Sequence, residues 1–324
     1  MHNFFFIVNR LTYNEDLIKW CDVVVPCGGD GTFLLAASRV RDNSKPVIGF
    51  NSSPQKSVGR LCLPTWCSND VKGALNALKE GKFTWMRRSR IRTTITCEPK
   101  LLDTITPVDL HTLYFSRYPP VTQQHDSPET GQPLREQNSK PVCEPLATKV
   151  LPFLALNEVF IGESVTSRVS LLRLQIDNGK WTHTKSSGLC VTTGTGSTSW
   201  HFSINCLRTH SVMELMKILS DEFGVKVDTR LEKAREVAET FSTDSEYLAY
   251  SVREYITFEE WPAPRGLRVR DRATSVKVKS HCVDAGLVID GSVSFPFNDG
   301  TEALLEIHPE DTLMTVHMDD ALHH

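Results

Sequence analysis

The feature that most limits how this chain can fold is an apolar strand that runs directly into a glycine-rich turn and then into a helix. Residues 22–26 read Asp-Val-Val-Val-Pro, residues 28–32 read Gly-Gly-Asp-Gly-Thr, and a helical stretch begins at Phe33. The order predicts a loop at the carboxyl end of a buried strand. Because the first N–H groups of a helix lack backbone partners and carry positive partial charge, such a loop binds phosphates well.

Asp30, in the middle of this turn, is harder to explain by packing. A carboxylate beside a phosphate repels it unless a metal ion or a proton transfer is involved, so the turn favours phosphoryl transfer over simple phosphate binding. The alternative is a Gly-Asp-Gly turn that only reverses the chain. The apolar strand before the turn and the helix after it make the functional interpretation the stronger one.

The pattern of apolar residues divides the 324-residue chain into two parts. Strand 23–26, helix 33–40 and strand 46–51 form a βαβ unit, which favours a parallel sheet, and residues 69–79 add a helix. We therefore predict an α/β nucleotide-binding domain over 1–88 with a parallel sheet, and a β-rich, largely antiparallel domain over 89–324. Strands of the second domain are predicted at 91–96, 171–176, 275–279, 287–289, 293–297 and 303–307.

Other segments carry weaker signals. Asp290-Gly291 and Asp299-Gly300 lie between strand patterns, where type I′ hairpin turns prefer Asp-Gly. Residues 118–147 are rich in Pro, Gln, Ser and Glu and are predicted to be a mobile insertion. Residues 210–238 have a helical pattern. The apolar run 4–8 is too short for a membrane span or a signal peptide and is interpreted as a core strand.

Composition excludes several classes of protein. A net charge of −3 and a pI near 6.4 give no basic surface of the kind that nucleic-acid binding needs. Nine cysteines without paired CxxC spacing indicate free thiols rather than disulfides or a zinc site. No membrane-binding stretch or transit peptide is recognised, so any targeting signal is expected to lie outside this chain.

A second candidate site is Asn157-Glu158, which interrupts the apolar run 151–161. An amide and a carboxylate in such a run need partners, because a buried polar group without one costs roughly 1–3 kcal/mol. Ribose hydroxyls of a bound nucleotide would satisfy both side chains. The alternative is an edge strand whose side chains reach solvent.

A third candidate is the hydroxyl-rich loop 192–200, Thr-Thr-Gly-Thr-Gly-Ser-Thr-Ser-Trp, which follows a short strand at 189–191. Its hydroxyls could form a second cradle for an anion and a ribose. Equally, Ser197 or Thr198 could cap the helix that follows. The loop alone does not separate these interpretations.

Two basic stretches, 87–92 and 265–279, alternate like solvated strand faces, which is the preferred interpretation. One or two of these cations could instead bind ATP phosphates, but the sequence does not indicate which.

The three motifs in this order resemble the NAD kinase family. The resemblance includes Gly28–Thr32, Asn157-Glu158 and Thr195–Thr198, and extends to residues 47–51, 59–61, 287–291 and 297–300. The sequence of residues 156–163 and the Thr-Gly-Thr-Gly form of the third motif are most similar to the divergent mitochondrial branch. The Gly-Gly-Asp-Gly-Thr motif alone is also found in lipid kinases of the same superfamily.

The resemblance implies ATP-dependent phosphorylation of the adenosine 2′-hydroxyl of NAD, with Mg²⁺ held by the ATP phosphates and no metal site of the protein's own. It implies a homodimer in mitochondria, with the cytoplasm as alternative. Neither nucleic acid nor a membrane is expected as a partner, because the chain has no basic surface and no membrane-binding stretch. Asp30 would be the proton acceptor. The residues implied to bind ATP or NAD are Gly28, Gly29, Gly31, Thr32, Asn157, Glu158, Thr195, Gly196, Ser197, Thr198, Ser199 and Ser203.

Three departures keep rival functions open. Ser187 stands where the family commonly has Asp, Ser199-Trp200 stands where bacterial members have Ala-Tyr, and only residues 1–13 precede the matching stretch. The rivals are a lipid kinase of the same superfamily and a catalytically weak nucleotide-binding or regulatory homologue.

Overall fold

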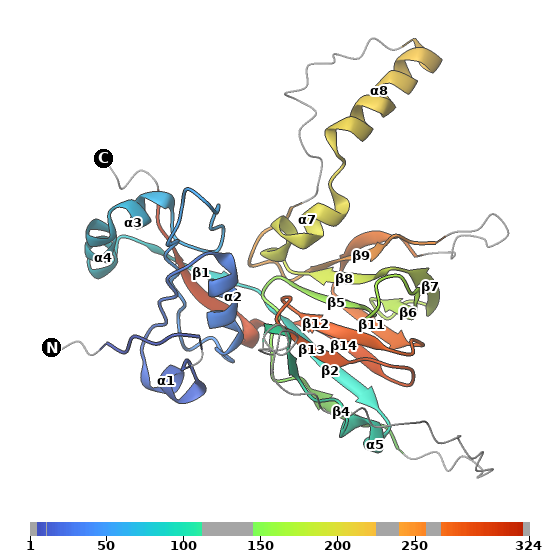
Figure 1. Ribbon diagram of the computed structural model, residues 1–324, viewed down its shortest axis with the longest axis horizontal. Coiled ribbons are helices and arrows are strands. Elements are labelled where there is room, and N and C mark those ends of the chain that lie inside the picture. The colour runs from blue at the N-terminus through green and yellow to red at the C-terminus, as the bar shows by residue number, and fades with distance from the viewer. Residues whose placement is uncertain (1–4, 11, 112–144, 225–239, 257–266, 320–324) are drawn as a thin grey trace, which may run out of the picture.

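The computed structural model describes residues 5–10, 12–111, 145–224, 240–256 and 267–319. The predicted insertion 118–147 lies mostly outside these ranges, as does the part of the predicted helix 210–238 beyond residue 224. Figure 1 shows an N-terminal helical unit on one side, a β-sandwich on the other, and helix α8 projecting from the sandwich.

Four short helices form most of the N-terminal unit: α1 Glu15–Trp20, α2 Asp30–Ser38, α3 Thr65–Asn69 and α4 Val71–Lys79. Asp70 caps α4 by accepting a hydrogen bond from the Gly73 N–H at 2.9 Å. This cap splits the predicted helix 69–79 at its first turn, because the cap residue lies outside helical geometry.

Residues 24–27 and 47–50 run parallel, with bridges Val24–Val47 and Cys27–Phe50. Backbone bonds such as Phe50 N to Pro26 O at 2.9 Å hold them together. Within the described part of the chain these segments make isolated bridges rather than strands, so the predicted parallel sheet is not confirmed and stays a prediction.

The second part is a sandwich of two sheets, and the predicted antiparallel pairing of its strands is confirmed. One sheet has the order β4 Ala147–Val150, β2 Ile91–Cys97, β14 Glu302–Ile307, β11 Ser275–Ser280, β6 Ser170–Ile176, β7 Thr182–Ser186. The other has the order β10 Arg270–Ala273, β9 Leu248–Arg253, β8 Gly188–Thr192, β5 Glu158–Glu163, β12 Ala285–Ile289, β13 Val293–Pro296, β3 Val108–Asp109. Further helices are α5 Pro99–Leu102, α7 Trp200–Asn205 and α8 Thr209–Phe223, with 3₁₀ turns η1 Gly196–Thr198 and η2 Pro309–Asp311.

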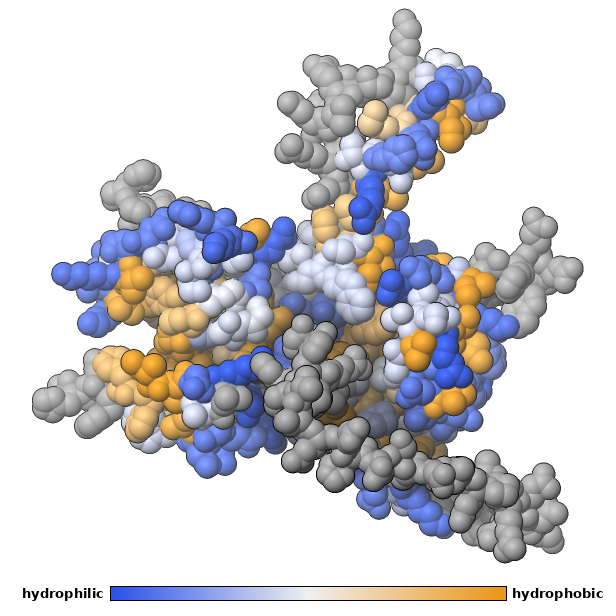
Figure 2. Space-filling view, viewed as in Figure 1, coloured by the Kyte–Doolittle hydropathy of each residue, from blue (hydrophilic) through white to orange (hydrophobic). Residues whose placement is uncertain are grey.

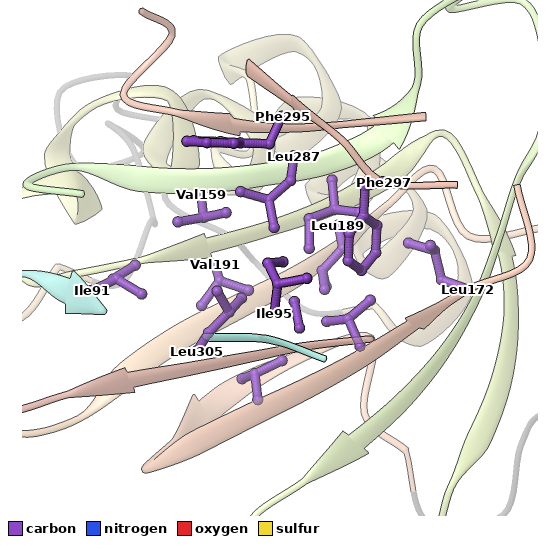
Figure 3. Packing of buried hydrophobic residues seen from close by; sticks show 14 of the residues in the cluster. Ile91, Ile95, Val159, Leu172, Leu189, Val191, Leu287, Phe295, Phe297 and Leu305 are labelled. Atoms are coloured by element: carbon purple, nitrogen blue, oxygen red, sulfur yellow. The ribbon is translucent and has the colours of Figure 1, made fainter. Parts of the chain in front are cut away.

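The main core fills the space between the two sheets. Alternate residues of each strand point inward, so Ile95 and Leu305 of one sheet meet Val191 and Leu287 of the other (Figure 3). All four side chains are fully buried. The period-2 apolar pattern predicted these strands correctly.

The last strand returns to the N-terminal unit. β15 Leu313–His317 pairs antiparallel with β1 Thr84–Arg88, and the Val47 N–H donates to Met314 O at 2.9 Å. The two predicted domains are therefore joined by this strand pair, and their boundary at residue 88 stays a prediction.

Two expectations are wrong. Residues 5–8 are not a core strand: Phe5 is 83% and Ile7 99% exposed, and no strand is assigned there. Asp299-Gly300 does not form a hairpin turn, since it joins β13 and β14, which belong to different sheets. Asp290-Gly291 does link the hairpin β12–β13, and both residues have the positive φ that a type I′ turn requires.

Candidate active site

The Gly-Gly-Asp-Gly-Thr motif leads into a helix as predicted, but α2 spans Asp30–Ser38 rather than 33–40, so Asp30, Gly31 and Thr32 form its first turn. The helix begins at Asp30 with Gly29 as its N-cap residue. Gly28 cannot carry a side chain, because a Cβ there would lie 2.3 Å from Thr32 Oγ1. A Cβ on Gly31 would have no neighbour within 4 Å, so the surface beside this residue is open to a ligand.

The half-buried Asp30 carboxylate is tied to the loop that follows residues 46–51. Its two oxygens accept the backbone N–H groups of Leu61 at 2.8 Å and Arg60 at 3.1 Å. Gly59 precedes them at a φ of +62°, and a Cβ there would lie 2.5 Å from the Asn51 amide. Each carboxylate oxygen keeps a further lone pair, so Asp30 is held in place and can still accept a proton.

Asn157 and Glu158 are buried at the start of β5, between β8 and β12 in the sheet, so the edge-strand alternative is wrong. The Asn157 side-chain N–H₂ donates to Ser199 Oγ at 3.2 Å. Asn157 Oδ1 and Glu158 Oε2 are buried and have no hydrogen-bond partner among the described residues. Because buried polar atoms are nearly always paired, these two acceptors point to a ligand with hydroxyl or amide donors.

Asp290 fixes the backbone of this pair, a role that the sequence pattern did not reveal. Its carboxylate accepts the N–H groups of Leu156 and Asn157, each at 2.8 Å, and that of Glu158 at 3.1 Å. Burial raises the pKa of Asp290 to about 6, while the three N–H groups and Arg90 oppose the rise. Burial also raises the pKa of Glu158 to about 8, and the charge of Asp290 adds to this rise.

The raised pKa of Glu158 predicts how stability depends on pH. Between the ordinary value of 4.5 and about 8, the folded protein keeps a proton that the unfolded chain releases, so the free energy of unfolding falls as the pH rises through this window. Glu158→Gln should remove a slope of about 1 kcal/mol per pH unit between pH 6 and 8. Urea denaturation at pH 6 and at pH 8 gives the free energy of unfolding at each pH, and hence the slope. Glu163→Gln, on the same strand, is the control, and an unchanged slope in Glu158→Gln would contradict the assignment.

The hydroxyl-rich loop folds tightly over the Asn-Glu pair. Thr192 Oγ1 donates to Asn157 O at 2.9 Å, and a Cβ on Gly196 would lie 2.1 Å from the same oxygen. Glycine is therefore required for this close approach. Ser197 and Thr198 do not cap α7, since their hydroxyls donate to Gly194 O at 2.7 Å and Thr195 O at 3.3 Å, both just before η1. The N-cap residue of α7 is Ser199, without a side-chain cap bond.

The remaining predicted residues are placed as follows. Thr195 is buried and faces Arg88, which donates to its hydroxyl at 3.3 Å. Thr32 and Ser203 are exposed, Thr32 on α2 and Ser203 on α7. The hydroxyl of Ser187 donates to the Glu254 carboxylate, so an acid lies beside this position although the residue itself is serine.

The basic stretch 87–92 is not a solvated face, which corrects the preferred interpretation. Arg88 is 7% and Arg90 1% exposed. Arg92 forms an ion pair with Asp311 at 2.6 Å. In the second stretch, the described strands β10 and β11 do alternate between more and less exposed residues.

A shared apolar cluster brings the motifs together. Phe33 of α2, Leu61 of the loop bound by Asp30, and Leu156, which precedes Asn157, belong to the same buried group. Arg88 then links the two loops, because its charge interacts with Asp30 while its guanidinium binds Thr195. A glycine turn at the start of a helix, an adjacent carboxylate, and a buried pair of acceptors without partners among the described residues are the features expected of a nucleotide phosphotransferase.

Comparisons with known proteins identify the family. The ATP-NAD kinase N-terminal domain matches residues 9–82. Human "NAD kinase 2, mitochondrial" is 37% identical over 316 residues, which cover 96% of this chain and 68% of that protein. The chain therefore belongs to the NAD kinase family.

Solved structures agree on the fold. The yeast NADH kinase structure with NADH has a TM-score of 0.56 at 15% identity, covering 93% of this chain and 63% of that one. The Archaeoglobus fulgidus NAD kinase structure with ATP has a TM-score of 0.53 at 16% identity, covering 95% of this chain and 81% of that one.

Proposed function

We propose that this protein is an NAD kinase, which transfers the γ-phosphoryl group of ATP to the adenosine 2′-hydroxyl of NAD and releases NADP and ADP. The observation that carries the proposal is the pair of buried acceptors on Asn157 and Glu158, which have no partner among the described residues. They directly follow Leu156, which packs in the same apolar cluster as Phe33 of the helix that presents Asp30. Adjacent ribose hydroxyls are donors of the kind that these acceptors lack.

The reaction follows from these positions. Asp30 takes the proton of the 2′-hydroxyl, whose oxygen forms a bond to the γ-phosphorus while the bond to the β,γ-bridging oxygen breaks. The backbone N–H groups of Gly29 and Gly31 would bind the phosphates. Those of Gly28 and Thr32 donate to Phe50 O at 2.9 Å and Gly29 O at 3.0 Å, so these two residues would act by shaping the turn. The loop residues Thr195, Gly196, Ser197, Thr198, Ser199 and Ser203 line the NAD side, with Ser197 acting mainly by fixing the loop through Gly194.

Mg²⁺ enters this proposal as part of the nucleotide substrate. As the family resemblance implies, the ion would be held by the ATP phosphates. Within the described residues no group of three His, Cys, Asp or Glu side chains could hold a metal ion. When bound there, Mg²⁺ neutralises part of the charge on the transferred phosphoryl group.

The test is direct. Purified protein is incubated with NAD, ATP and Mg²⁺, and NADP is detected with an NADP-specific dehydrogenase; NADH and polyphosphate are tested in parallel as alternative acceptor and donor. Formation of NADP supports the proposal. Product formed from NADH but not from NAD would make NADH the substrate. NAD binding without product favours the regulatory homologue, and phosphorylation of a lipid favours the lipid kinase.

Oligomeric state and location are proposed on the same basis. We propose a homodimer, which helix α8 supports, because Leu215, Ile218, Leu219 and Phe223 expose an apolar face on it (Figure 2). Mitochondrial location is proposed from the name of the human relative. Light scattering after gel filtration tests the homodimer, and localisation of the tagged protein in cells tests the mitochondrial location. No described helix is long and apolar enough to cross a membrane.

A further inference from the structure

Arg88, the last residue of β1, is a buried cation that the local structure leaves incompletely paired. It is 7% exposed, and its NH1 donates to Thr195 Oγ1 at 3.3 Å. Its Nε is buried and has no hydrogen-bond partner in the described part of the chain. Burial lowers the pKa of Arg88 to about 10, with the charge of Asp30 opposing the change, so the guanidinium stays positive at neutral pH.

Arg90, two residues further on, shows what a structural arginine looks like in the same environment. Its guanidinium donates from Nε to Asp311 O at 2.6 Å, from Nη1 to Val40 O and from Nη2 to Asp42 O at 3.2 Å. These carbonyls satisfy the buried charge and join the link between β1 and β2 to η2 and to the residues that follow α2. Arg88 has neither carbonyl partners nor, among the described residues, an ion pair. A buried cation is costly without such partners, so its retention here calls for an anion.

The position of Arg88 indicates which anion. β1 places Met86 and Arg88 on one face, where they line a cavity of about 470 Å³ together with residues 58–65. The same loop donates the two N–H groups that hold Asp30. Arg88 therefore lies between the loop bound by Asp30 and the loop of Thr195, beside a space large enough for phosphate groups.

We propose that Arg88 is a phosphate-binding residue whose guanidinium holds the triphosphate of ATP between the Asp30 turn and the Thr195 loop. The inference rests on the proposed function. A guanidinium presents several N–H donors in one plane and matches phosphate oxygens, so the incoming triphosphate supplies the partners that Arg88 lacks. Asp30 itself does not fill this role, because its oxygens accept backbone N–H groups and no ion pair joins it to Arg88.

The test compares Arg88→Gln with Arg87→Gln, which removes the same charge from an exposed side chain on the neighbouring position of β1. Loss of a charge-assisted hydrogen bond should raise the KM for ATP roughly 10–100-fold in Arg88→Gln. The KM for NAD should stay within about twofold, since the loss falls on one substrate. Arg87→Gln should match the wild type for both substrates.

Ligand-induced thermal stabilisation separates binding from folding. ATP should raise the Tm of wild type and Arg87→Gln but not of Arg88→Gln, while the shift with NAD persists in all three. If Arg88→Gln does not fold, Arg88→Lys takes its place and should show a smaller loss of ATP affinity. An unchanged KM for ATP, or a rise confined to NAD, overturns the inference. Wild-type protein that makes no NADP overturns the proposed function instead, and the ATP-induced Tm shift then still decides the role of Arg88.

Discussion

Asp30→Asn is expected to lower turnover about 10²–10⁴-fold while NAD still binds, because the amide cannot take the 2′-hydroxyl proton. The substitution conserves shape, and the amide oxygen can keep the bond from the Leu61 N–H. The loop around Gly59 should therefore hold its place. Steady-state kinetics give the change in kcat, and calorimetry gives the Kd for NAD.

A matched control for Asp30→Asn is Asp70→Asn. Asp70 also places a carboxylate at the start of a helix, but it accepts the Gly73 N–H of α4 and none of the site residues. Its substitution should leave kcat unchanged and cost only a fraction of the cap energy, about 1 kcal/mol or less. Wild-type turnover in Asp30→Asn would count against Asp30 as the proton acceptor.

Asp290→Ala is expected to destabilise the fold and abolish tight NAD binding. The substitution leaves three buried N–H groups without an acceptor, at roughly 1–3 kcal/mol each. Asp290 also has a φ of 47°, a conformation that alanine tolerates poorly and asparagine tolerates better. The free energy of unfolding in urea should fall by at least roughly 3 kcal/mol, the lower limit that three such N–H groups give.

Asp290→Asn separates the loss of the hydrogen bonds from the strain of the backbone. Its amide oxygen can accept part of the three N–H bonds and its backbone fits the turn, so it should lose less stability than Asp290→Ala. Both variants remove the charge that raises the pKa of Glu158, so the pH dependence of stability should shift to lower pH. An Asp290→Ala protein within about 1 kcal/mol of the wild type would contradict the role of this carboxylate.

The parts of the fold that follow from local pattern could be predicted from the sequence. Alternating apolar residues predicted β2, β6, β11 and β14, and the glycines of residues 28–31 predicted the start of α2, because both signals act over a few residues. The prediction of a core strand at residues 5–8 failed because an apolar run alone does not supply a partner strand. In the described chain no strand pairs with these residues.

The parts of the site that depend on distant residues could not be predicted. Asp290 was recognised as a turn residue, but its hydrogen bond to the Leu156 N–H spans 134 positions. The burial of Arg88 and Arg90 depends on β15 pairing with β1, which brings the end of the chain against its first third. Alternating charge in residues 87–92 suggested a solvated face, because the sequence does not show what packs over it.

The fate of the γ-phosphate tests the central claim most directly. Wild-type protein is incubated with ATP labelled in the γ-phosphate, NAD and Mg²⁺, and the dinucleotide is isolated and its phosphate position determined. We expect label on the 2′-oxygen of the adenosine ribose, with the signal reduced about 100-fold or more in Asp30→Asn. Label that stays in ATP, or that appears only as free phosphate, would contradict it.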